Sequence, residues 1–196
     1  SDVLIVADKS SNPEWLASDL LGQAEHDQLA QCILISKNKN ILEKTKKEVF
    51  EQLKNLPRSS IAKKSLMMNG ILIYANSDKK IIEIINKIGP EHLELNVKNY
   101  KSFVAKIKNA GSVCLGKYAV MAMTDYGAPG SNHVLPTDSS SKYSSGLNVS
   151  EFMKKISYIT LSKKGIDKLG PSVITLANYE GLQGHAQSIV KRIRRK

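Results

Sequence analysis

The sequence predicts an α/β fold: an incomplete doubly wound, mostly parallel sheet with helices on both faces, followed by a small C-terminal helical arm. Short runs that are apolar throughout, such as Val3–Ala7, alternate with longer segments whose apolar residues recur every three or four positions. Strands covered on both faces read as continuous apolar runs, and their alternation with helices is typical of parallel sheets. Polar, turn-rich sequence after Gly116 and a separate amphipathic pattern near the end predict two parts. These are a Rossmann-like half domain over 1–147 and a helical dimerisation arm over 148–196.

Five strands are expected in the first part, over Val3–Ala7, Cys32–Ser36, Ile71–Ala75, Leu93–Leu95 and Val113–Leu115. Asn12-Pro13 is typical of a helix start, and we expect this helix to run to about His26. Three more helices should follow over Ile41–Leu56, Ile61–Met68 and the segment from Ser77 to Ile88, and a further one over Tyr100–Lys108 with Gly111 as its cap.

The last quarter of the chain has its own helical pattern. We expect a helical section over Val149–Ile156, then either a strand or an extended link at Tyr158–Leu161. Two helices should follow, over Lys163–Tyr179 and Gln183–Arg194.

The amino-acid composition argues against some classes of binding partner and cellular location. The net charge of +11 suggests an anionic partner, but the lysines are scattered and aromatic residues make up only 6% of the chain. The single dense basic run, Lys191–Lys196, contains no aromatic residue, so we expect no nucleic-acid partner. Cys32 and Cys114 lie in apolar runs and predict buried thiols of a reducing compartment, and no apolar run is long enough to cross a membrane. These features predict a cytoplasmic protein. Ser1 leads straight into a core strand with no Met, so we expect a piece of a longer protein.

Glu91 and His92 are the first candidate catalytic pair. They follow Gly89-Pro90, which ends the helix before them. Histidine titrates near neutral pH and a desolvated glutamate can be raised toward it, so the pair suits proton transfer. Alternatively, Glu91 and His92 are ordinary residues of a solvent-exposed turn. Ligands of parallel sheets usually bind beyond the carboxyl ends of the strands, so we expect the site there. No glycine-rich dinucleotide or phosphate-binding motif is present.

The four histidines, His26, His92, His133 and His185, each stand beside polar residues near the ends of predicted elements. A zinc-type ion needs about four nitrogen, oxygen or sulfur ligands. Gln23 and His26 lie one helical turn apart, Asp125 adds a carboxylate and His185 an imidazole. These residues are candidate metal ligands, although lone histidines are more often ordinary surface or core residues.

Several segments, taken together, resemble the histidinol dehydrogenase family in order and spacing. They are Ser18–His26, Gly89–Leu93, Ala110–Val113, Asp125-Tyr126 and Asn132–Thr137. Ser1 falls on the serine of the family's Gly-Pro-Ser-Glu motif, with Asp2 in place of the glutamate. The resemblance covers the whole chain but only about the C-terminal half of the family's chain.

The resemblance implies a zinc enzyme that oxidises L-histidinol to L-histidine with two molecules of NAD, the last steps of histidine biosynthesis. It implies that Gln23, His26, Asp125 and His185 hold one zinc per subunit. It further implies that His92 is the base, that Glu91 activates water, and that Ser1 and Glu180 contact substrate together with His92 and the zinc ligands. The NAD contacts would lie mostly in the family's N-terminal half.

In this family the C-terminal arm reaches the partner subunit's site, so the resemblance implies a homodimer in which Glu180 and His185 act in trans. The sequence departs from the family pattern by one extra residue between Asp125 and His133 and by glycines at 181 and 184. We expect the isolated chain to turn over nothing measurable. A catalytically inactive module that binds metal and dimerises is the alternative function.

Overall fold

The first 151 residues fold around one five-stranded sheet. The structure is a computed structural model that describes residues 1–127, 130 and 132–193. The strands are β1 (Asp2–Ala7), β2 (Gln31–Ser36), β3 (Gly70–Tyr74), β4 (His92–Asn96) and β5 (Ser112–Leu115). They are ordered β3-β2-β1-β4-β5, and every neighbouring pair is parallel. The predicted α/β class with a parallel sheet is confirmed.

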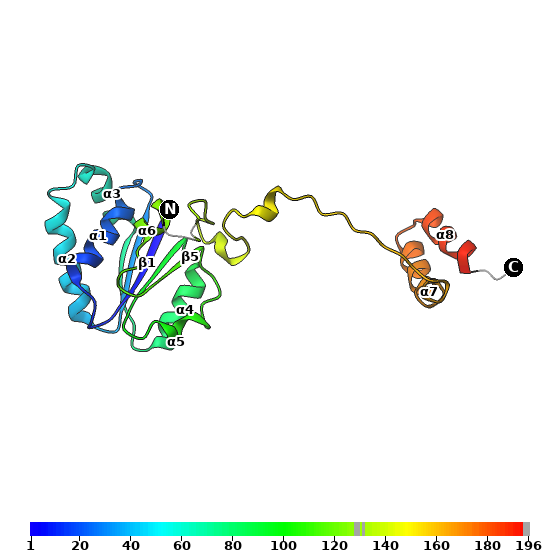
Figure 1. The fold of residues 1–196 in the computed structure, drawn as a ribbon, viewed down its shortest axis with the longest axis horizontal. Helices are drawn as coiled ribbons and strands as arrows, with labels where there is room; N and C mark the ends of the chain where they lie inside the picture. The colour runs from blue at the N-terminus through cyan, green and yellow to red at the C-terminus, as the bar shows by residue number, and fades with distance from the viewer. Residues whose placement is uncertain (128–129, 131, 194–196) are drawn as a thin grey trace. The chain divides into compact units, whose positions relative to one another are not determined.

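Helices cover both faces of the sheet (Figure 1). On one face, α1 (Pro13–Ala24), α2 (Lys39–Leu53), α3 (Ser59–Asn69) and the short α6 (Met121–Tyr126) pack on Val3, Ile5 and Leu34. On the other, α4 (Asp78–Ile88) and α5 (Lys101–Val104) pack on Leu4, Val6 and Leu93. Along β1 and β2, successive side chains point alternately to these two faces. Because both faces are covered by helices, these strands are apolar throughout.

Local caps fix the helices that the sequence predicted best. The Asn12 side chain accepts a hydrogen bond from the Glu14 amide at the start of α1. Ser77 caps α4 in the same way, accepting from Lys80. Gly89 ends α4 in the left-handed conformation, with φ of 64°, which glycine adopts without steric cost.

The expected helix over Tyr100–Lys108 was wrong beyond Val104, because α5 has only four residues. The Asn86 side chain on α4 instead accepts hydrogen bonds from the Lys108 and Asn109 amides and draws the chain away from helical geometry. Gly111 is not a helix cap. Its amide donates to the Pro90 carbonyl, and a Cβ there would lie 2.7 Å from the Glu91 carbonyl oxygen. The glycine permits this close approach of two backbones.

Helix α6 was not predicted, because it lies where the sequence becomes turn-rich. Between this helix and residue 163 the described chain is irregular apart from two 3₁₀ turns, Ser140–Lys142 and Val149–Phe152. The second of these replaces the expected helical section over Val149–Ile156. Residues Tyr158–Leu161 are an extended link without strand pairing in the described structure.

Residues Phe152–Lys196 form a second compact unit. Its helices, α7 (Lys163–Tyr179) and α8 (Gln183–Ile193), pack closely at Gly170, where a Cβ would lie 3.0 Å from Ile189. Both helices were predicted, although Arg194, the expected last residue of α8, lies outside the described residues. Within the described parts of the chain, no helix combines the length and the hydropathy needed to cross a bilayer.

Candidate active site

The candidate residues of the first unit gather at the amino-terminal ends of the parallel strands. We call this side of the sheet its amino-terminal edge, and the side where the strands end its carboxyl edge. His92 is the first residue of β4, Glu91 directly precedes it, and His92 lies opposite Val3 near the start of β1. Gln23 lies in the last turn of α1, which runs back toward the same edge. The expectation of a site beyond the carboxyl ends was therefore wrong for these residues, because His92 starts its strand instead of ending it.

The carboxyl edge offers a contrast, because its polar groups are already paired. There the Asp8 carboxylate accepts hydrogen bonds from the Ser10 amide and hydroxyl and from the Lys98 amide. The Ser11 hydroxyl donates to the Asn96 carbonyl. No buried side-chain atom at this edge lacks a partner among the residues that the structure describes.

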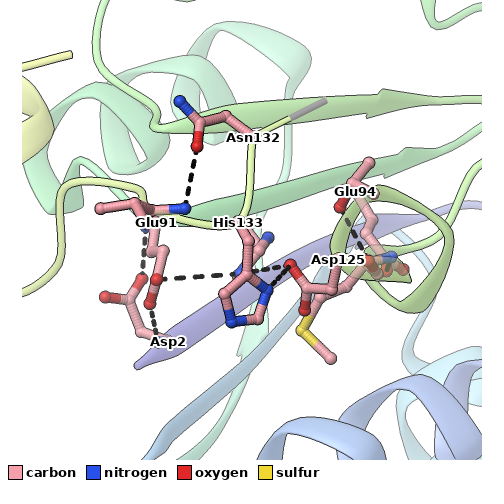
Figure 2. Close-up of polar contacts among 10 residues, drawn as sticks. Asp2, Glu91, Glu94, Asp125, Asn132 and His133 are labelled. Atoms are coloured by element: carbon pink, nitrogen blue, oxygen red, sulfur yellow. Dashed lines mark hydrogen bonds and ion pairs between the residues drawn. The ribbon is translucent and has the colours of Figure 1, made fainter. Parts of the chain in front are cut away.

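Glu91 is held by Asp2, a residue that the sequence analysis gave no role. The Asp2 amide donates to Glu91 Oε2 at 3.1 Å, and the Glu91 amide donates to Asp2 Oδ1 at 2.8 Å (Figure 2). Both residues are buried. Burial raises the pKa of Asp2 above its usual value, and the neighbouring Glu91 charge raises it further. The backbone of β1 therefore fixes the Glu91 carboxyl group.

His92 lies between two carboxylates. Its Nε2 atom is 3.9 Å from Glu91 Oε1 and 3.9 Å from Asp125 Oδ1. Burial lowers the pKa of His92, while Asp125 and Glu91 act in the opposite direction. The imidazole is therefore neutral near neutral pH. A neutral imidazole between two carboxylates can accept a proton and hold the resulting charge.

Asp125 comes from α6, and its Oδ1 atom also lies 3.6 Å from His133 Nδ1 (Figure 2). The Asp125 side chain is nearly covered, whereas that of His133 is largely exposed. Asp125 thus belongs to the same cluster as His92. In the connecting loop, where the chain has its additional residue, Ala128, Pro129 and Ser131 lie outside the described structure.

Gln23 and His26 have different surroundings. Gln23 is fully buried, and neither polar atom of its amide has a hydrogen-bond partner in the described residues. Helix α1 ends at Ala24, two residues before its expected end, so His26 lies just beyond it, exposed. His26 and Asp125 line one cavity of about 290 Å³, together with Arg58 and Met121. That volume is at the lower end of small-molecule sites.

These side chains fit a divalent cation. Eight buried side-chain polar atoms have no hydrogen-bond partner among the described residues, and four of them belong to three candidate residues of this edge: Gln23, His92 and Asp125. Buried polar atoms are rarely left unpaired, so such a cluster points to a missing ligand. The Gln23 carbonyl, the Asp125 carboxylate and the His26 imidazole are suitable donors. Within the described chain, no three His, Cys, Asp or Glu side chains are grouped closely enough to hold a metal without further ligands.

Ser1, Glu180 and His185 are the remaining predicted residues. Ser1 is exposed, and its carbonyl accepts a hydrogen bond from the Gln31 amide. Glu180 follows the last residue of α7 and His185 lies in α8, both exposed and both in the second compact unit. Their predicted role in a partner subunit's site stays a prediction.

Sequence reasoning missed three acids of this edge: the buried Asp2 and Glu94 and the half-buried Asp19. Two of them had a signal in the spacing. Asp19 lies one helical turn before Gln23, and Glu94 lies two residues after His92 and so on the same face of β4. Asp2 offered no comparable signal, because its contact with Glu91 joins residues 89 positions apart.

Comparison with known proteins identifies the family. The family model described as histidinol dehydrogenase matches residues 1–193. The chain belongs to the histidinol dehydrogenase family. This agrees with the resemblance of the sequence segments.

Individual relatives in this family agree with the match. The chain is 73% identical over 196 residues to histidinol dehydrogenase of Pelagibacter ubique, covering all of this chain and 46% of that protein. It is 44% identical over 189 residues to histidinol dehydrogenase of Listeria monocytogenes, covering 96% of this chain and 44% of the relative. The chain therefore spans a little under half the length of these relatives.

A solved structure shares the fold. The crystal structure of histidinol dehydrogenase from Elizabethkingia anophelis matches with a TM-score of 0.85 and 40% identity, covering 98% of this chain and 44% of that one. The Elizabethkingia anophelis enzyme therefore shares the backbone arrangement of this chain over 44% of its own length.

Proposed function

We propose that this chain is the C-terminal portion of a histidinol dehydrogenase, and that it carries most of the catalytic and zinc-binding residues. The proposed reaction is the zinc-dependent, NAD-linked, four-electron oxidation of L-histidinol through L-histidinal to L-histidine. The observation that carries the proposal is the burial of Glu91, His92 and Asp125 in one cluster.

His92 is the proposed base for the alcohol. Its neutral imidazole takes the substrate hydroxyl proton, and the carboxylates of Glu91 and Asp125 stabilise the imidazolium that forms. NAD supplies the acceptor for the hydride that leaves the carbinol carbon. Separating the base from the water activator lets one site handle two different protons.

Glu91 is the proposed activator of water for the second oxidation. Its carboxylate is oriented by the Asp2 amide on one side and faces His92 on the other. In this orientation it can take a proton from the water that adds to the aldehyde. The second oxidation then yields the carboxylic acid.

Gln23, His26 and Asp125 are the proposed zinc ligands from one subunit, with His185 as the fourth. Zinc bound there supplies a positive charge that orients and polarises the substrate. Ser1 and Glu180 are proposed to contact the substrate. The unpaired amide of Gln23 and the unpaired Asp125 oxygen support this ligand set.

A homodimer is proposed because the second unit leaves an apolar helix face uncovered. Leu169, Val173, Leu176 and Tyr179 recur at helical spacing along α7 and are all exposed. An apolar stripe of this kind commonly marks an interface. The dimer would bring Glu180 and His185 to the partner's site.

The alternative is an inactive module that binds metal and dimerises, and one experiment separates the two. Zinc-loaded chain is assayed for histidinol-dependent NADH formation, alone and after addition of a polypeptide matching the other half of the relatives. The proposal predicts NADH only with the added half. NADH from the chain alone would contradict the expected dependence on that half. Zinc binding with no NADH in either case would favour the alternative.

A further inference from the structure

Two carboxyl groups beside the candidate site, those of Asp19 and Glu94, each have a buried oxygen and do not belong to the proposed ligands. Glu94 on β4 is 1% exposed, and its Oε1 atom accepts a hydrogen bond from the Met121 amide at 2.8 Å. Its Oε2 atom and Asp19 Oδ2 on α1 are both buried, and neither has a partner among the described residues that donates a proton to it. The two carboxyl groups lie close enough that each affects the pKa of the other.

Two ionised carboxylates would repel each other at close range, so we infer that Asp19 and Glu94 share one proton. Burial raises the pKa of both groups, and the charge of Asp19 raises that of Glu94 further. Their mutual hydrogen bond raises the pKa of Glu94 and lowers that of Asp19, so the proton resides on Glu94. Protonated Glu94 donates to ionised Asp19, and both unpaired oxygens are then satisfied.

The pair joins the three elements that carry the first unit's candidate residues. Asp19 lies one turn before Gln23 on α1, and Glu94 lies two residues after His92 on β4. Met121, the partner of Glu94, is the first residue of α6, one turn before Asp125. Helix α6 has six residues and no local side-chain cap, so its start depends on Glu94.

We propose that Asp19 and Glu94 are positioning residues: through the Met121 amide they hold α6, and with it Asp125, against Gln23 on α1. The purpose of this arrangement rests on the proposed function, because Asp125 and Gln23 are its zinc ligands. Neither acid is proposed to contact the substrate.

Hydrogen exchange of the Met121 amide in the metal-free chain tests the proposal directly. Glu94→Ala should speed this exchange about tenfold or more, as expected for the loss of one buried hydrogen bond, while the β1 amides keep their protection. Glu94→Gln should retain the slow exchange, because its carbonyl accepts from Met121 and its amide donates to Asp19. Asp8→Ala is the matched control, since it removes a hydrogen-bonded acid from the opposite edge of the sheet.

Two results would overturn the proposal. One is unchanged Met121 exchange in Glu94→Ala, and the other is equal acceleration in Glu94→Ala and Glu94→Gln. If Glu94→Ala does not fold, Asp19→Ala takes its place, with faster Met121 exchange expected and unchanged exchange contradicting the proposal.

Zinc titration separates this proposal from the proposed function. Glu94→Ala should weaken zinc binding about tenfold or more relative to the unmodified chain, and Glu94→Gln should not. If the unmodified chain binds no zinc, the proposed function fails, and the exchange of Met121 still decides whether the acid pair positions α6.

Discussion

Asp2 and Glu91 exchange two hydrogen bonds although 89 positions separate them in the sequence. Each residue's amide donates to the other's carboxylate. This pairing brings the start of β1 to the turn before β4 and orients the Glu91 side chain toward His92. Asp2, the first residue of the central strand β1, thus becomes part of the candidate site.

Asp2→Ala should lower the free energy of unfolding by about 1–3 kcal/mol, because the buried Glu91 amide loses its acceptor. Asp2→Asn is the control, since its side-chain oxygen still accepts that hydrogen bond. Urea unfolding of the three chains measures the difference. Equal stability of Asp2→Ala and the unmodified chain would show that the pairing contributes nothing.

His92 should make stability depend on pH in a definite direction. Its pKa is lowered in the folded chain, so the unfolded chain binds a proton first as the pH falls below about 6.5. The contribution of His92 is therefore fully present above that pH and is lost as the pH falls through the folded pKa. The slope is at most about 1.4 kcal/mol per pH unit.

His92→Gln should remove this pH dependence from the metal-free chain, whereas His133→Gln, at an exposed imidazole, should leave it in place. Asp125→Asn should lower the pKa of His92 further, because the Asp125 charge favours the imidazolium. Titration of the His92 ring by NMR measures this pKa. An upward movement in Asp125→Asn would contradict the geometry of the cluster.

Gly111→Ala should destabilise the chain by about 2 kcal/mol or more, because the new Cβ would lie 2.7 Å from the Glu91 carbonyl oxygen. Gly22→Ala is a matched control in the same unit. Its Cβ would meet only Met121 Cε, at 3.8 Å, so it should stabilise α1 by about 0.5–1 kcal/mol. Thermal unfolding should rank Gly22→Ala above the unmodified chain and Gly111→Ala below it.

Sequence patterns predicted what depends on near neighbours. Asn12-Pro13 at the start of α1 and Gly89 at the end of α4 act through contacts within a few residues, and both were found as expected. The parallel sheet followed from strands that are apolar on both faces. Glu91 and His92 could likewise be singled out, because the helix stop before them is local.

The parts that were wrong or missed depend on distant residues. Helix α6 starts where the Met121 amide meets Glu94, and α5 stops early because Asn86 on α4 accepts from Lys108. Gly111 is explained by the carbonyl of Glu91, not by a helix end. The amino-edge position of His92 is an exception, because a residue that starts a strand of a parallel sheet lies at that edge, and the order of helix end, Glu91-His92 and strand was visible in the sequence.

The proposed action of His185 in trans can be tested by mixing two variants that each lack one proposed zinc ligand. His26→Ala removes a ligand from the first unit, and His185→Ala removes one from the arm. Random exchange of subunits makes half of the dimers mixed, and each mixed dimer has one complete site of two, so zinc binding should recover to about a quarter of the unmodified level. If both ligands come from one subunit, mixing restores nothing.

Zinc content across a sizing column tests the central claim most directly. The account predicts about one zinc per chain in a dimer peak, and a loss of that zinc in His26→Ala with the dimer intact. Zinc-free chain after equilibration with excess zinc, or equal zinc in the unmodified chain and His26→Ala, would contradict the assignment of Gln23, His26, Asp125 and His185 as the metal site.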